Sequence, residues 1–138
     1  MKYFIDTNIF LRVLIQEDKK QFTECKNLLQ RVKENKLDAC TGTIVLAEVV
    51  WTLGSYYQYS KAQVVEAVKS IFNLRGLRIL DTYDNARAIE LFEKYSVKYI
   101  DTLIASYAEI ADKDITIISY DRDFAKLPVL YKTPREVI

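Results

Sequence analysis

The stretch Ile115-Thr116-Ile117-Ile118-Ser119 is the clearest β-strand in the sequence. Its apolar, β-branched residues run without alternation, which is typical of a strand that is buried on both faces of a sheet. A second short apolar strand, Lys2–Ile5, opens the chain and runs directly into Asp6. Both strands therefore deliver a polar side chain to the end of the predicted sheet.

Helical patterns separate these strands from three others. Helices are expected over residues 7–15, 18–35, 43–57 and 60–76, from Asp81 or Thr82 to 95, and over 101–112. Further short strands are expected over residues 36–41, 77–80 and 129–131. Strands that alternate with helices predict an α/β fold, a three-layer α/β/α sandwich around a central parallel sheet.

The bulk properties of the chain limit its class. Its 138 residues, half of them hydrophobic, predict a single domain over residues 1–138. No apolar run is long enough to cross a bilayer, and the first residues do not resemble a secretion signal, so a cytoplasmic location without membrane contact is expected. Cys25 and Cys40 fit no zinc or Cys-x-x-Cys spacing and are expected to be free thiols. The net charge of +1 disfavours a strongly basic binding module, although segregated charges could still bind nucleic acid.

The chain contains no histidine. This excludes Ser-His-Asp and Cys-His catalysis, histidine general bases and histidine-bound zinc. Any chemistry must therefore use carboxylates, lysines, hydroxyl groups or a metal ion that is bound by oxygen.

Four acidic residues from distant segments could meet at one edge of the sheet. In open α/β sheets ligands bind just outside the carboxyl ends of the strands. Asp6 directly follows the first strand, and Asp121 follows the strand that ends at Ser119. Asp101 opens a predicted helix and Glu48 lies within another, so all four side chains could line one cleft.

Three of these acids have simpler explanations. Asp6 could be the N-cap of the following helix, and Asp101 could be a cap as well. Asp121 and Asp123 could be turn residues in Ser-Tyr-Asp-Arg-Asp-Phe. Glu48 is harder to explain in this way, because its helical neighbours Ile44, Val45 and Trp51 are apolar and an uncompensated carboxylate among them is costly.

A divalent cation would resolve the repulsion within such a cluster. Clustered and buried carboxylates repel one another and have raised pKa values. Oxygen ligands without nitrogen or thiolate suit Mg²⁺ or Mn²⁺. Such an ion can activate a bound water and stabilise the charge that develops on a phosphodiester, while a remaining carboxylate orients the water.

The same residues fall into four motifs that resemble those of PIN-domain nucleases. The motifs occur in the family's order and span nearly the whole chain: Phe4-Ile5-Asp6-Thr7-Asn8, Leu46-Ala47-Glu48-Val49, Tyr99-Ile100-Asp101-Thr102-Leu103-Ile104-Ala105 and Ile117-Ile118-Ser119-Tyr120-Asp121-Arg122-Asp123-Phe124. One departure is Ser119, where threonine is commoner in the family; the hydroxyl group is retained.

This resemblance implies a PIN-like α/β/α sandwich with Mg²⁺ or Mn²⁺ bound by Asp6, Glu48, Asp101 and Asp121 as the catalytic residues. It implies that Asn8, Ser119 and Asp123 support these ligands. A chain of this size looks most similar to a VapC-type toxin ribonuclease of a toxin–antitoxin pair. The resemblance then implies an RNA substrate, a homodimer and a small antitoxin protein that covers the active site.

Contacts to substrate phosphates would come from cations near these motifs, for which the candidates are Arg12, Lys98, Arg122 and Lys126. The tyrosines, densest at Tyr56, Tyr57 and Tyr59, are better explained by packing or subunit contact than by base stacking.

Other functions fit less well. A haloacid-dehalogenase-type phosphatase would need an aspartate where Asn8 stands, and a receiver domain would need an acidic pair before its first strand. A non-catalytic PIN-like module that binds RNA or protein would be expected to lose acidic positions. A PIN-type nuclease that acts on DNA or in RNA processing shares the same chemistry and remains an alternative.

Overall fold

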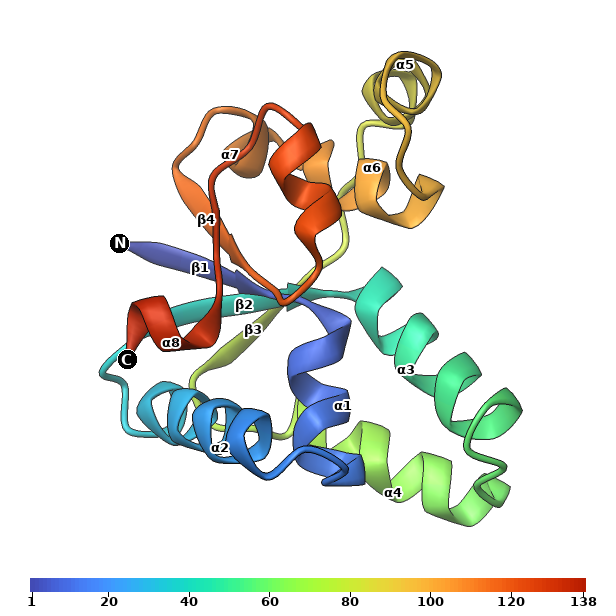
Figure 1. Ribbon diagram of the computed structural model, residues 1–138, viewed down its shortest axis with the longest axis vertical. Helices are drawn as coiled ribbons and strands as arrows, with labels where there is room; N and C mark the ends of the chain where they lie inside the picture. The colour runs from blue at the N-terminus through green and yellow to red at the C-terminus, as the bar shows by residue number, and fades with distance from the viewer.

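Five parallel strands form the centre of the molecule (Figure 1). The computed structural model describes residues 1–138 and orders the strands β3-β2-β1-β4-β5. The strands are β1 (Lys2–Ile5), β2 (Asp38–Gly42), β3 (Leu77–Leu80), β4 (Ile115–Ile118) and β5 (Tyr131–Lys132). In the register of the sheet, Phe4 of β1 lies between Cys40 of β2 and Ile117 of β4.

Helices connect the strands and cover both faces of the sheet. They are α1 (Thr7–Ile15), α2 (Lys19–Lys33), α3 (Thr43–Ser55), α4 (Lys61–Phe72), α5 (Asn85–Lys94), α6 (Tyr99–Ala105), α7 (Ala108–Ala111), the 3-10 helix η1 (Arg122–Lys126) and α8 (Pro134–Val137). The chain steps from β1 to β2 to β3 in one direction and then crosses back to β4. Right-handed crossovers therefore place α1 to α4 on one face and α5 to α7 on the other (Figure 1). The predicted α/β fold, a parallel sheet flanked by helices, is confirmed.

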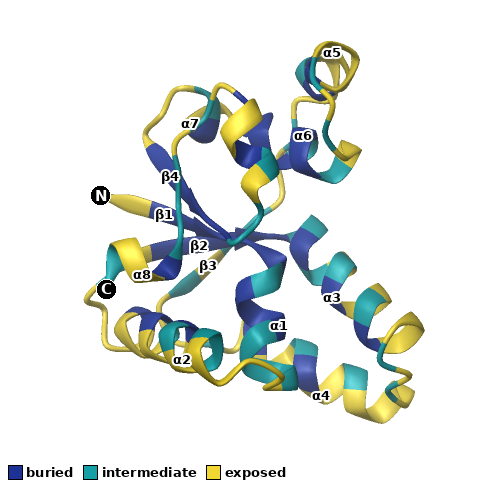
Figure 2. Cartoon of the chain, viewed as in Figure 1, coloured by how far each residue is buried: buried dark blue, intermediate teal, exposed yellow.

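Apolar side chains of the central strands form the core. Phe4, Ile5, Ile117 and Ile118 are fully buried. Figure 2 shows buried residues along β1, β2 and β4 and on the inward sides of the helices, whereas the outward sides are exposed. Burial of such side chains is the main favourable contribution to folding. Cys25 and Cys40 are buried free thiols, as predicted, and no helix is long and apolar enough to cross a membrane.

Several predicted element boundaries were wrong. The strand predicted over residues 129–131 is β5 at Tyr131–Lys132, and the helix predicted over residues 60–76 ends at Phe72. The single helix over residues 101–112 is two helices, α6 and α7, because Tyr107 adopts an extended backbone conformation between them. Its buried hydroxyl donates to the carbonyl oxygen of Leu80 at 3.1 Å, which holds it there. The N-cap of α5 is Asp84, not Asp81 or Thr82: its carboxylate accepts from the backbone N–H of Arg87 at 3.0 Å. Asp81 instead accepts from the hydroxyl of Thr43 at 2.6 Å.

The topology locates the region where a ligand can bind. β1 and β4 are neighbours, but the chain leaves them toward opposite sides of the sheet. In open α/β sheets a crevice forms at such a point, outside the carboxyl ends of the two strands.

Candidate metal centre

An acidic cleft of about 170 Å³ lies at this point. Four of the nine residues that line it are acidic. The nine are Asp6, Thr7, Asn8, Leu11, Glu48, Thr52, Lys98, Asp101 and Asp121. The acids come from the ends of β1 and β4 and from helices α3 and α6. The structure thus brings together the four acids that the sequence placed at this edge, while their role as metal ligands stays a prediction.

Asp6 faces the cleft and does not cap its helix. It occupies the N-cap position of α1, yet its side chain makes no capping hydrogen bond. Its Oδ2 instead accepts from the hydroxyl of Ser119 at 2.6 Å and from the amide of Asn8 at 3.4 Å. The simpler explanation of Asp6 as a side-chain cap was therefore wrong.

Ser119 connects Asp6 to the loop that carries Asp121. While its hydroxyl donates to Asp6, the same oxygen accepts from the Asn8 side-chain amide and from the backbone N–H of Asp121, both at 2.9 Å. The Oδ1 of Asn8 accepts from the backbone N–H of Tyr120 at 3.2 Å. Ser119 thus uses its one donor and both acceptor sites, and it fixes the ends of β1 and β4 relative to each other.

We expect Ser119→Ala to lower both stability and metal affinity. The substitution removes the acceptor of the Asp121 N–H and the nearer of the two acceptors of the half-buried Asn8 amide, and the loss of each such hydrogen bond costs about 0.5–1.5 kcal/mol. Loss of a supporting hydrogen bond typically weakens metal binding by about 10- to 100-fold. Urea unfolding and isothermal titration with Mn²⁺ measure the two effects. Ser119→Thr, which keeps the hydroxyl group, is the matched control; equal Mn²⁺ affinity in Ser119→Ala and wild type would contradict this role.

Asp101 offers a carboxylate oxygen that nothing in the protein satisfies. It lies in the first turn of α6 and is only 3% exposed. Its Oδ2 is buried without a hydrogen-bond partner. Lys98 is the N-cap residue of α6, so Asp101 is not a cap. A buried carboxylate oxygen without a partner is costly unless a cation binds it, so Asp101 fits a metal ligand.

Asp121 and Asp123 are turn residues and are also close to Asp101. The Asp121 carboxylate accepts from the backbone N–H of Asp123 at 2.9 Å, as the turn explanation predicted. Nevertheless, one carboxylate oxygen each of Asp101, Asp121 and Asp123 lie within 4.8 Å of one another. Asp123, predicted only to support the ligands, is therefore close enough to share a cation with two of them.

The electrostatics of the cleft reflect this crowding. The pKa of Asp6 is raised from 3.8 to about 6, mainly by burial and to a lesser extent by the charges of Glu48 and Asp121, against the lowering effect of the hydrogen bond from Ser119. Burial likewise raises the pKa of Asp101 from 3.8 to about 7, against the opposing effect of Lys98. The other residues of the protein therefore leave the negative charge of these carboxylates uncompensated. A cation that binds there would relieve the repulsion between them.

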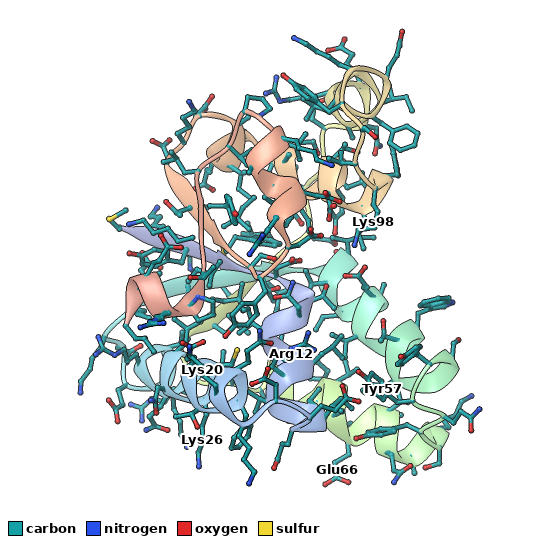
Figure 3. The ribbon with its side chains drawn as sticks, in the orientation of Figure 1. Arg12, Lys20, Lys26, Tyr57, Glu66 and Lys98 are labelled. Carbon is teal, nitrogen blue, oxygen red and sulfur yellow. The ribbon has the colours of Figure 1, made fainter.

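Of the four predicted phosphate-binding cations, only Lys98 lines the cleft (Figure 3). Its ammonium lies 3.4 Å from the Asp121 carboxylate. Partial desolvation lowers the pKa of Lys98, but the charges of Asp101, Asp121 and Glu48 outweigh it and raise the pKa overall.

The other three cations do not line the cleft. Arg12 of α1 donates to Gln21 of α2. Lys126 lies 3.1 Å from Asp123, and Arg122 is exposed in η1.

Glu48 is half-buried rather than enclosed. Val45 is buried on one side of it, but Trp51 is 68% exposed, so the apolar neighbours predicted from the sequence do not all cover it. Three lining residues, Thr7, Leu11 and Thr52, were not among the site residues predicted from the sequence. Thr7 stands between Asp6 and Asn8, and its hydroxyl is also buried without a partner; that position between two polar residues was the available signal.

The donor set fits a hard divalent cation. Every candidate ligand is a carboxylate oxygen, and neither cysteine is in the cleft. Mg²⁺ and Mn²⁺ bind such oxygens, and Mg²⁺ keeps several positions open for water or substrate.

Comparisons with known proteins agree with this fold. The family model described as PIN domain matches residues 3–130. No curated protein matched the sequence.

Three solved structures have the same fold at low sequence identity. VapBC2 from Rickettsia felis bound to a promoter DNA fragment has 20% identity and a TM-score of 0.65, covering 96% of this chain and 98% of that one. DNA-bound VapBC from Salmonella typhimurium has 18% identity and a TM-score of 0.68, with coverages of 97% and 98%. A toxin–antitoxin complex from Klebsiella pneumoniae has 22% identity and a TM-score of 0.60, with coverages of 96% and 97%.

Proposed function

The chain belongs to the PIN-domain family, and from this premise we propose that it is a metal-dependent endoribonuclease that hydrolyses RNA phosphodiester bonds. One observation carries the proposal: four acids from four separate segments line one cleft, and a buried oxygen of Asp101 lacks any partner.

The residues of the cleft suit distinct tasks. Asp6, Glu48, Asp101 and Asp121 would hold Mg²⁺ or Mn²⁺, and Asp123 is close enough to assist. When bound, the ion supplies an activated water and stabilises charge on the phosphate. Asn8 and Ser119 hold Asp6 in place through hydrogen bonds. Lys98 lies 3.4 Å from the Asp121 carboxylate and gives the cleft a positive charge that would contact a substrate phosphate.

The chemistry predicts a strict dependence on divalent cations. We expect the purified protein to cleave a mixed panel of RNAs in Mg²⁺ or Mn²⁺ and to lose this activity fully in EDTA. Denaturing gels of RNA, and of DNA with the same sequences, measure the reaction. No cleavage of any RNA by a folded protein free of inhibitor would contradict the proposal, and cleavage of DNA alone would favour a DNA nuclease. Retention of RNA without cleavage would favour a binding module.

We further propose that the protein is the toxin of a toxin–antitoxin pair and forms a homodimer. The similar structures are VapBC complexes and a toxin–antitoxin complex, which supports a protein inhibitor as the partner. Exposed apolar side chains on α3 and α4, among them Val50, Val65 and Phe72, offer a surface that a second copy could cover. Sedimentation equilibrium tests the dimer, which has twice the 16.1 kDa mass of one chain.

A further inference from the structure

Trp51 is a large aromatic residue that the protein leaves in water. It is the only tryptophan in the chain and is 68% exposed. Single exposed apolar residues are common on protein surfaces and need no explanation by themselves. The position of Trp51 on α3, rather than its exposure, gives it significance.

Trp51 lies beside the acidic cleft. Glu48 and Thr52 of the same helix line that cleft. At 100° per residue, Trp51 lies 60° around the helix from Glu48, on the side opposite the buried Val45 and Val49. Side chains three residues apart on a helix have their Cβ atoms about 5–6 Å apart. Trp51 therefore projects from the exposed side of α3 next to Glu48, and an indole attached there is long enough to reach a group next to one bound at Glu48.

In the metal-free protein, two of the lysines near the cleft are paired with its acidic residues. Phosphate contacts normally supply most of the non-specific affinity of nucleic-acid-binding proteins. Here Lys98 pairs with Asp121 and Lys126 pairs with Asp123, while the net charge is only +1. Stacking on an aromatic face adds a contribution of about 1–3 kcal/mol per base that does not depend on these charges.

We propose that Trp51 stacks on an unpaired base next to the scissile phosphate, so that it is a substrate-binding residue that selects single-stranded over duplex RNA. This inference rests on the proposed ribonuclease function. Bases within a duplex are already stacked on both faces and cannot place one against the indole, whereas bases in loops and single strands can.

Intrinsic fluorescence tests the contact directly, because all tryptophan emission comes from Trp51. The wild type is titrated with a single-stranded oligoribonucleotide in Ca²⁺ in place of Mg²⁺, and the anisotropy of labelled RNA reports binding independently. We expect quenching that follows binding, and no quenching by the same sequence as a duplex. Binding without any change in emission, or no binding of RNA at all, would overturn the inference. An emission shift that depends only on protein concentration would also overturn it, since a second copy would then cover Trp51.

Steady-state cleavage separates stacking from a structural role. Trp51→Ala is expected to raise KM for single-stranded RNA by about 5- to 150-fold, which corresponds to the 1–3 kcal/mol of one stack, and to leave kcat within about twofold. Trp51→Phe should retain most of the affinity. Tyr56→Ala is the matched control, because Tyr56 is a 74% exposed aromatic residue at the C-cap of the same helix, about 12 Å along the helix axis from Glu48; its KM should equal that of wild type.

The failure of this inference differs from the failure of the proposed function. A wild type that cleaves no RNA would refute the ribonuclease proposal, while the fluorescence titration would still decide the stacking. An active Trp51→Ala variant with an unchanged KM would refute the stacking but would not contradict the ribonuclease proposal. A lower kcat with an unchanged KM would mean that Trp51 positions Glu48, which also overturns the inference.

Discussion

Asp101→Asn is expected to reduce Mg²⁺-dependent RNA cleavage by at least about a hundredfold, while the metal-free protein becomes more stable. The Asp101 carboxylate is buried, and one of its oxygens has no partner within the protein. A metal ion contributes several kcal/mol to catalysis of this type, and each 1.4 kcal/mol corresponds to a factor of ten. The amide removes one negative charge from the ligand set and with it much of that contribution.

The stability effect has the opposite sign. At pH 8 the deprotonated Asp101 is desolvated and repelled by Asp121, Asp6 and Glu48. A neutral amide of the same shape relieves this penalty, so the free energy of unfolding in EDTA should rise by about 1 kcal/mol or more, since one pKa unit corresponds to about 1.4 kcal/mol. Urea unfolding and gel-based cleavage assays measure the two effects. Asp112→Asn, an exposed acid at the end of α7, is the control and should change neither. Equal cleavage by Asp101→Asn and wild type would contradict the account.

The metal-free protein is expected to lose stability as pH rises from about 4 to 8. The pKa values of Asp6 and Asp101 in the folded state are about 6 and 7, against 3.8 for an ordinary aspartate. Between these values the folded state still holds protons that the unfolded state has released, so the free energy of unfolding falls with pH through that window. Each pKa unit corresponds to about 1.4 kcal/mol, so the two aspartates together correspond to a fall of up to about 7 kcal/mol.

A divalent cation should oppose this trend and make the fall in stability with pH smaller, because it binds the deprotonated carboxylates. At about 100 times its dissociation constant it stabilises the folded state by about 2.7 kcal/mol. Urea titrations at several pH values, in EDTA and in Mn²⁺, measure both curves. Glu66→Gln, on α4 away from the cleft (Figure 3), is the control and should keep the wild-type profile. Stability in EDTA that rises from pH 4 to 8 would show that the acids are not desolvated together.

The central strands of the sheet were predictable because their sequences show only a strand pattern. The runs Lys2–Ile5 and Ile115–Ile118 show no helical spacing of apolar residues, and a polar residue follows each run directly. The rule that ligands lie at the carboxyl ends of parallel strands then placed Asp6 and Asp121 at the same edge. The PIN-domain resemblance, read from the four motifs, is confirmed by the family match over residues 3–130.

Other features depend on tertiary contacts that the sequence does not show. The predicted helix is interrupted at Tyr107, whose hydroxyl donates to the carbonyl oxygen of Leu80, 27 residues away. The Ser119 hydroxyl forms hydrogen bonds with Asp6 and Asn8, more than a hundred residues away, and with the nearby backbone of Asp121. The sequence indicated only that Ser119 supports the ligands. The exposure of Trp51 likewise follows from how α3 packs, not from the apolar residues around Glu48.

The central claim is that the acidic residues of the cleft bind a divalent cation together. A crystal structure of the wild type grown in Mn²⁺, with an anomalous difference map, tests this claim most directly. We expect a Mn²⁺ peak in the cleft within about 2.3 Å of the free oxygen of Asp101 and of at least one other cleft carboxylate. An empty cleft at saturating Mn²⁺, with the four acids turned away from one another, would contradict the account.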